Sequence, residues 1–150
     1  MKIVIQRVTH ASVTINGSVK SQIGNGFLLL LGVADGDTKE DADWIVKKVA
    51  GLRVFDDENG VMNRSIMDVD GEILAISQFT LLASYKKGNR PSYIHAAKHE
   101  ISIPLYEYFC QKLREETGKD IGTGEFGADM KVELLNDGPV TICMDTKNKE

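Results

Sequence analysis

The sequence predicts a mixed α/β or α+β domain with more than one β-sheet layer. Along its 150 residues, strand-like segments come first, then a helical pattern, more strands, two further helical patterns and final strands. No internal repeat, low-complexity linker or change of composition interrupts this order. We therefore expect a single domain that spans residues 1–150.

The first strands are predicted from β-branched residues and a turn signal. KIVIQRV and ASVTING alternate in strand fashion, and Asn16-Gly17 marks a hairpin turn before SVKSQIG. The apolar run GFLLLLGVA that follows is continuous rather than alternating. Such a run is typical of a central strand that is buried on both faces.

A helix is predicted after the turn residues DGDT. Thr38 is a plausible N-cap, because Asp41 follows it three residues later as in a capping box. The apolar residues then recur three or four positions apart, which is helical spacing. They are Ala42, Ile45, Val49 and Leu52.

The second half of the chain predicts strands around two helices. LRVF is extended, DDENG is a turn and EILAISQFTLL is a further core strand. SYIHAAKHE predicts a short helix, and Pro104 fits the first turn of a longer one that ends at Thr117-Gly118. After the glycine-rich loop GTGEFGADM, KVELLNDGPVTICMD predicts two strands joined at Asp137-Gly138, and we expect the tail TKNKE to fray.

Composition and charge narrow the function classes. The net charge of −4 argues against a general nucleic-acid coat, although a local contact with RNA stays possible. Neither MKIVIQRV nor FLLLLGVA has the form of a signal peptide or membrane span, so we expect a cytoplasmic protein. Cys110 and Cys143 lie in apolar segments without CxxC spacing, which indicates buried free thiols.

Polar residues at the end of an apolar strand are the first candidate for chemistry. Thr80 could be a nucleophile if a distant base folds beside it, or a β-favoured residue on a half-buried strand. The loop SYKKGNRPSY then gathers Lys86, Lys87 and Arg90. These cations form either a solvated loop or, at the mouth of a pocket, a contact for a phosphate backbone.

Three other motifs carry weaker signals. His95 and His99 have the spacing of two metal ligands, but the glutamate of HExxH and a third ligand are missing, so we expect no metal. GTGEFG lacks the spacing of a triphosphate-binding loop, and backbone turns with positive φ explain its glycines better. Gly138-Pro139 fits either a hairpin turn or a cis bond, and physics alone does not choose.

The chain resembles the D-aminoacyl-tRNA deacylases over essentially its whole length. The segments SQFTL (77–81), GNRPSY (88–93) and NDGPVT (136–141) are similar to signature segments of that family. MKIVIQRV and TGEFGADM also match in place and order, while Tyr93 stands where the family more often has Phe. The resemblance implies two packed, largely antiparallel sheet layers with flanking helices.

The resemblance also implies a homodimer that hydrolyses the ester between a D-amino acid and the 3′-terminal adenosine of tRNA, without a cofactor. Gly138 and Pro139 would form a cis pair that enters the partner subunit's pocket and excludes the L side chain. Phe126 and Met130 would help to wall the adenosine end. The remaining residues implied to line the reacting ester are Ser77, Gln78, Phe79 and Thr80.

Three hypotheses follow from these residues together. We expect attack by water assisted by the substrate's own 2′-OH, with the Phe79 and Thr80 N–H groups as oxyanion donors; Thr80 as covalent nucleophile is the alternative. A protein that binds the tRNA end without catalysing a reaction is the alternative of another class.

Arg7 interrupts an apolar strand, so we expect it to support the Gly138-Pro139 loop or else to face outward from an edge strand.

Overall fold

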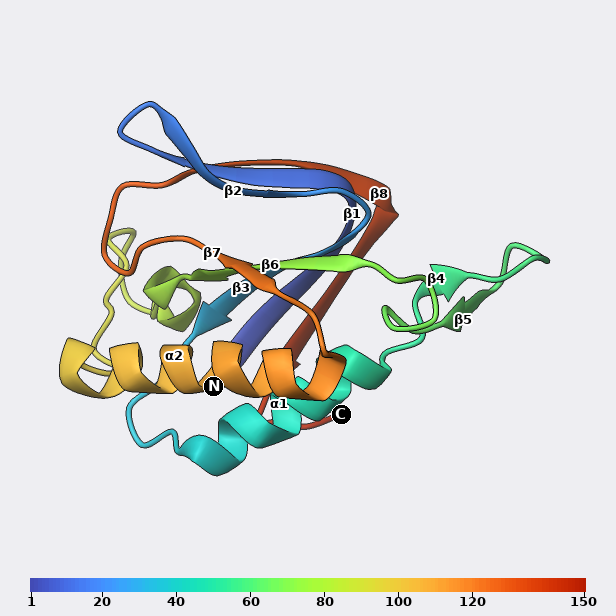
Figure 1. Cartoon of the computed structure of the whole chain (residues 1–150). Helices are drawn as coiled ribbons and strands as arrows, with labels where there is room; N and C mark the ends of the chain where they lie inside the picture. Colours follow the sequence, from blue (N-terminus) through green and yellow to red (C-terminus); the bar gives the residue numbers. More distant parts are fainter.

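A computed structural model describes every residue from 1 to 150, and it confirms the mixed α+β fold class. Most strands belong to one six-stranded sheet, and a small two-stranded sheet stands apart from it (Figure 1). The large sheet contains β1 (Lys2–Ile15), β2 (Ser18–Ile23), β3 (Gly26–Gly32), β6 (Glu72–Ser77), β7 (Ile121–Thr123) and β8 (Lys131–Asp145). The other elements are β4 (Phe55–Asp56), β5 (Met62–Arg64), the helices α1 (Lys39–Gly51) and α2 (His99–Thr117), and the 3₁₀ helix η1 (Phe79–Leu82).

The large sheet bends into two layers that enclose a core. Strand β1 pairs antiparallel with β8 along most of its length, with β3 through its first half and with β2 through its second half. Strands β6 and β7 continue from β3 in parallel. One cluster, which includes Val8, Val13, Leu28 and Ile76, packs between the layers, because alternate residues of a strand face opposite sides.

Both helices lie on the other face of the sheet (Figure 1). There Phe27, Leu29 and Leu31 of β3 pack in a second cluster with Ile45 of α1 and Phe109 of α2. Because successive side chains of β3 enter both clusters, the prediction that this strand is buried on both faces is confirmed. Neither helix has the length and apolar composition needed to span a lipid bilayer.

Several local predictions are confirmed. Asn16 and Gly17 form a two-residue turn with φ of +50° and +78°, between β1 and β2. Helix α1 begins after Thr38, whose N–H donates to the Asp41 carboxylate at 2.8 Å. Gly118 ends α2 in the left-handed conformation.

The interpretation of residues 78–104 is wrong in three respects. Strand β6 ends at Ser77, and the chain turns into η1 rather than continuing as a strand. Residues 92–97 are not helical because their backbone groups pair elsewhere: Ser92 with Ser84, and Ala97 N–H with the Val33 carbonyl at 3.0 Å. Helix α2 begins at His99, five residues before Pro104. A proline has no N–H to donate to the carbonyl four residues before it. For Pro104 this carbonyl lies in the exposed first turn of α2, so the helix tolerates the proline.

Residues 131–145 are one strand rather than two strands joined by a hairpin. Both halves pair with β1, and the register jumps from Asn136 opposite Val8 to Thr141 opposite Gln6. The residues between them form a bulge that contains a cis Gly138-Pro139 peptide bond. The Asn136 side chain closes this bulge, since it accepts from Val140 N–H at 2.9 Å and donates to the Thr141 hydroxyl at 3.0 Å.

Two predictions near the chain ends are also wrong. The start of the tail is anchored, because the buried Thr146 hydroxyl accepts a hydrogen bond from the Met1 ammonium at 2.8 Å. Asp37 accepts a second bond from that ammonium at 2.7 Å.

Cys110 is buried as expected, but Cys143 is exposed, because β8 lies at the edge of the sheet and half of its side chains face outward. Both thiols are free.

Candidate active site

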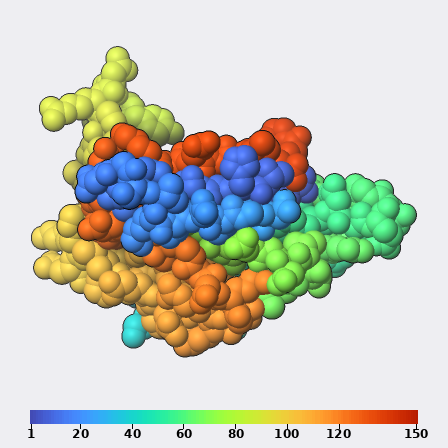
Figure 2. Space-filling model, turned by 45° about the horizontal axis from the view of Figure 1, so that its top comes forward, coloured from blue at the N-terminus to red at the C-terminus, as the bar shows by residue number.

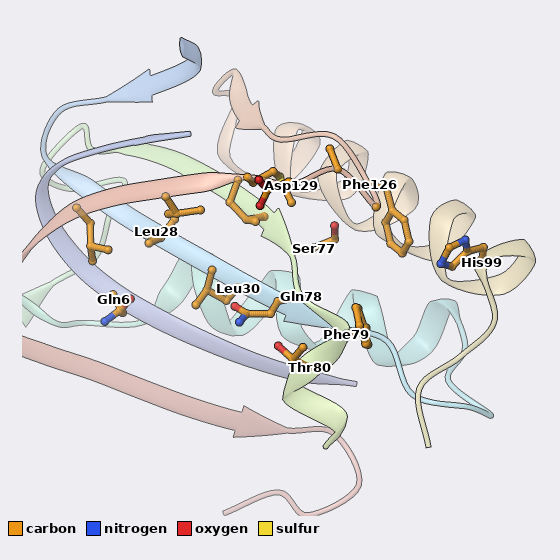
Figure 3. Close-up of a pocket in the computed structure, with 16 residues that line it drawn as sticks. Gln6, Leu28, Leu30, Ser77, Gln78, Phe79, Thr80, His99, Phe126 and Asp129 are labelled. Carbon is orange, nitrogen blue, oxygen red and sulfur yellow. The ribbon is translucent and has the colours of Figure 1, made fainter. Parts of the chain in front are cut away.

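A cavity of about 590 Å³ opens where β6 ends, between the two sheet layers and the start of α2 (Figure 3). It brings together six of the residues implicated by the sequence, from two segments some fifty positions apart. These are Ser77, Gln78, Phe79, Thr80, Phe126 and Met130. Apolar side chains of β3, β6 and β8 form one wall, which includes Leu28, Leu30, Ile76, Val132 and Leu134.

The end of β6 explains the polar run SQFT. Residues 73–76 are buried, and the Gln78 N–H makes the last bond to β3, at 2.7 Å from the Leu31 carbonyl oxygen. The chain then turns tightly across Gly32, where a Cβ atom would lie 3.0 Å from the Gln78 carbonyl oxygen. Glycine at this position of β3 therefore allows η1 to close against the sheet.

The first turn of η1 leaves two backbone donors free. Its first internal hydrogen bond runs from Leu81 N–H to the Gln78 carbonyl, at 3.3 Å. The N–H groups of Phe79 and Thr80 precede this bond and have no partner within the helix. Both residues line the cavity, so the turn can supply a pair of donors to an oxygen that develops negative charge.

The Thr80 hydroxyl has no base beside it. It makes no hydrogen bond to another side chain, and the titratable side chains that line the cavity are His99 and Asp129. Figure 3 shows both on other elements than Thr80, with His99 at the start of α2 and Asp129 in the loop before β8. This geometry favours a site that works through positioning and hydrogen-bond donors rather than through an activated threonine.

The loop 124–130 forms another side of the cavity. A Cβ atom on Gly124 would collide with the Met130 sulfur, so this glycine lets the loop fold back on itself. Phe126 packs edge to face with His99, with their ring centroids 5.3 Å apart, and also faces Tyr106. The Tyr106 hydroxyl donates to the Ala75 carbonyl at 2.7 Å. Burial and the nearby Cys110 raise the pKa of Tyr106 well above its usual value, so this anchor stays neutral.

Gly138 and Pro139 do not line the cavity of their own chain. They are exposed on the bulge of β8, and Gly138 has a φ of +129°, which favours glycine. Buried Arg7 lies behind the bulge, and its Nε donates to the Asp137 carbonyl at 3.0 Å. Its Nη1 donates to the Val54 carbonyl at 2.7 Å, which ties the bulge to the segment leading into β4. Arg7 therefore points inward, not out from an edge strand.

The basic loop, residues 85–91, follows the cavity residues 77–80 in the sequence and projects from the body of the molecule. Residues 84 and 92 pair at its base through two backbone hydrogen bonds of 2.7 and 2.8 Å. Figure 2 shows the segment between them standing away from the rest of the surface. Residues 73–99 contain no Asp or Glu, although the whole chain has 22. The cavity residues 77–80 are thus followed in the sequence by a locally cationic segment of an acidic protein.

Sequence reasoning missed several residues of the cavity. For His99, the sequence indicates a polar surface or core histidine, with a metal ligand as the less favoured alternative. No group of three or more His, Cys, Asp or Glu side chains in the structure could hold a metal ion. Gln6 has a signal in the sequence, since it is a polar residue beside Arg7 in the mostly apolar start of β1. Asp129 has none, because exposed acidic residues in loops are common.

Comparisons with known proteins identify the family. A family model described as D-Tyr-tRNA(Tyr) deacylase matches residues 4–145. Curated relatives named D-aminoacyl-tRNA deacylase include those of Phocaeicola vulgatus, 72% identical, and Bacteroides thetaiotaomicron, 70% identical. Each of these matches covers all of both chains.

Two solved structures have the same fold as this chain. The c-Myc DNA Unwinding Element Binding Protein superposes with a TM-score of 0.92 at 44% identity, over 97% of this chain and 99% of that one. A probable eukaryotic D-amino acid tRNA deacylase shares the fold, with a TM-score of 0.81 at 17% identity over 95% of this chain and 97% of that one. The chain therefore belongs to the D-Tyr-tRNA(Tyr) deacylase family.

Proposed function

We propose that this chain hydrolyses the ester of D-aminoacyl-tRNA in the cavity at the end of β6. The family to which the chain belongs supports this reaction. The site supports it too, because the Phe79 and Thr80 N–H groups have no hydrogen-bond partner within η1. These donors can stabilise the oxyanion of an attacked ester. The exposed cations Lys86, Lys87 and Arg90 suit the phosphates of the tRNA acceptor end. A cytoplasmic location follows from such a substrate.

The proposed reaction needs neither a cofactor nor a protein base. A water oxygen adds to the ester carbonyl carbon while the neighbouring ribose 2′-OH assists in proton transfer. The tetrahedral oxyanion accepts hydrogen bonds from Phe79 and Thr80 N–H, and its collapse breaks the bond to the ribose 3′-oxygen, which takes up a proton. The products are the free D-amino acid and tRNA. Ser77 and Gln78 shape the floor beside these donors.

We further propose that two copies of the chain complete each site. Strand β8 pairs only with β1, so its outer edge is free in a single chain, and the exposed Gly138-Pro139 bulge lies on this strand. In a two-fold dimer, each bulge would enter the cavity of the other copy. Its carbonyls would crowd the α-carbon of the substrate and exclude an L side chain, while a D side chain points elsewhere.

A series of esters tests both the activity and this steric gate. The purified protein is expected to cleave D-Tyr-, D-Ala- and Gly-tRNA at similar rates, including glycine mischarged onto tRNA(Ala), and to spare L-Ala-tRNA. The reason is that carbonyls at the α-carbon cannot reject a hydrogen atom. Release of labelled amino acid over time measures each rate. A steep rise with D side-chain size, with glycine resistant, would instead show a side-chain pocket.

The same assay separates catalysis from mere binding. A protein that only bound the tRNA end would retain D-Tyr-tRNA on a filter and leave its ester intact. The match to the deacylase family over residues 4–145 argues against that alternative. Absence of cleavage at high enzyme concentration, with retention of the tRNA, would overturn the proposed reaction.

Arg7→Ala is expected to reduce stereoselectivity. The substitution removes two hydrogen bonds, one to Asp137 O within the bulge and one to Val54 O, which together join the bulge to the segment leading into β4. Bonds from charged donors contribute about 1.5–3 kcal/mol each, so we expect the D/L rate ratio to fall by about 10- to 100-fold. Single-turnover rates on D-Tyr- and L-Tyr-tRNA measure this ratio.

Arg53→Ala is the matched control for Arg7→Ala. Arg53 also binds the β4–β5 hairpin, through the Asn63 carbonyl at 2.9 Å, but it is exposed and makes no contact with the bulge. It should leave the ratio unchanged. Weaker tRNA binding by Arg7→Ala with the D/L ratio intact would contradict the supporting role of Arg7.

A further inference from the structure

The side chains of the basic loop, residues 85–91, have no charged or aromatic partner within the chain. All of these residues are exposed, and Tyr85 is 76% exposed. Lys86, Lys87 and Arg90 form no ion pair with any carboxylate. The Tyr85 ring packs on no other ring and receives no cation. One large aromatic side chain and three cations are therefore available to bind a partner.

Both ends of this loop are joined to the wall of the proposed active site. Before the loop, Ala83 N–H donates to the Thr80 carbonyl at 3.1 Å. After it, the Tyr93 ring packs edge to face on Phe79, with the ring centroids 4.9 Å apart. Both Phe79 and Thr80 line the cavity. Tyr85 is five positions after Thr80, a separation that an extended chain spans in at most about 18 Å. A ligand that extends out of the cavity by a few nucleotides can therefore reach Tyr85.

The backbone gives the loop a defined shape. Ser84 and Ser92 close its base by two hydrogen bonds of 2.7 and 2.8 Å. At its tip Gly88 has a φ of +79°, which lets the chain reverse direction. Tyr85 directly follows Ser84, so its backbone is held at the closed base of the loop rather than at the tip.

An exposed aromatic ring beside unpaired cations suits single-stranded nucleic acid. A base inside a duplex offers no open face, whereas an unpaired base can stack on a tyrosine ring. The phosphates on either side of that base can then contact Lys or Arg. A single exposed aromatic residue is ordinary on a protein surface. Tyr85 differs because it adjoins Lys86 and Lys87, within a stretch from 73 to 99 that has no acidic residue.

We propose that Tyr85 stacks on one of the unpaired nucleotides that precede the 3′-terminal adenosine, while Lys86, Lys87 and Arg90 contact the phosphates around it. The inference rests on the proposed function, in which the ester on that adenosine reacts in the cavity. The loop then selects an unpaired 3′ end and holds it while the ester occupies the cavity. Because every base has a face that can stack, the identity of the stacked nucleotide matters little.

Two substrates of different length test the stacking. D-Tyr-tRNA carries the preceding nucleotides, whereas the D-tyrosyl ester of adenosine lacks them. Tyr85→Ala is expected to lower kcat/KM for D-Tyr-tRNA by about 5- to 150-fold, mainly through KM, and to leave the rate on the adenosine ester unchanged. Its Tm should also stay unchanged, because the exposed side chain packs on no other ring.

Two further substitutions at the same position separate stacking from general apolar contact. Tyr85→Phe keeps the aromatic face and should match wild type on both substrates. Tyr85→Leu is the matched control, since it keeps an apolar side chain without a π-face. It should show the same loss on D-Tyr-tRNA as Tyr85→Ala.

Binding of unacylated RNA provides a measurement that does not depend on activity. Wild type should bind a hairpin RNA with an unpaired 3′ end more tightly than the same hairpin with a blunt end, and Tyr85→Ala should abolish this difference. Tyr85→Ala removes no charge, so the dependence of its affinity on salt should equal that of wild type. Lys86→Ala and Lys87→Ala should each reduce the slope of log K against log salt by about 0.7, as expected for one phosphate contact to a single strand.

Equal losses on D-Tyr-tRNA and on the adenosine ester in Tyr85→Ala would show a distorted cavity and refute the stacking. Wild-type kcat/KM on D-Tyr-tRNA in either Tyr85→Ala or Tyr85→Leu would refute it as well, and so would equal binding of the two hairpins by wild type. If wild type cleaves neither substrate, the proposed function itself fails. The hairpin measurements then still decide whether Tyr85 binds an unpaired 3′ end.

Discussion

Replacing the backbone N–H of Thr80 with an ester oxygen is expected to lower kcat for D-aminoacyl-tRNA by about 10²- to 10³-fold. Loss of one oxyanion donor has this effect in other acyl-transfer enzymes. The replacement is achieved by introducing the α-hydroxy acid that corresponds to threonine. Because this N–H precedes the first hydrogen bond of η1, its removal leaves the turn itself intact. Single-turnover release of amino acid gives the rate.

Thr80→Ala distinguishes the backbone donor from the side chain. It keeps the N–H and removes the hydroxyl, which has no base beside it, so we expect a change of less than about tenfold. An ester at Leu81 is the second control, since that N–H bonds to Gln78 within the turn and should affect Tm more than kcat. Complete loss in Thr80→Ala, with D-aminoacyl-tRNA still bound, would instead identify Thr80 as the nucleophile.

Leu135→Glu is expected to convert the protein to a folded monomer that has lost deacylation. Leu135 is 47% exposed on β8, one residue before the NDGPVT segment, where the proposed dimer brings two copies together. A two-fold interface repeats the substitution, so each dimer would gain two unpaired charges. We expect dimerisation to weaken by about 100-fold or more and activity at low protein concentration to fall with it.

Sedimentation and activity at matched concentrations test this dependence. Val19→Glu provides the control, because Val19 is also an exposed apolar residue on a strand, at 57%, but belongs to β2. It should change neither the oligomeric state nor the rate. A variant shown to be monomeric that keeps full activity and full rejection of L-aminoacyl-tRNA would refute the shared site.

Sequence alone determined the elements whose signals are local. The Asn16-Gly17 turn, the apolar run of β3 and the helix that begins after Thr38 each depend on residues within a few positions of one another. The segments SQFTL, GNRPSY and NDGPVT likewise identify the family, because their residues and their order are read directly from the sequence. The residues that they implicated at 77–80, together with Phe126 and Met130, do line one cavity.

Only the tertiary structure decided how distant segments share their hydrogen bonds. Residues 92–97 have a helical composition, yet their backbone groups pair with the end of β3 and with Ser84. The NDGPVT segment looks like a hairpin turn, but β1 pairs with both of its flanks and makes it a bulge. Arg7 meets that bulge across a separation of 130 positions in the sequence. Such contacts depend on packing between layers, and no local preference encodes them.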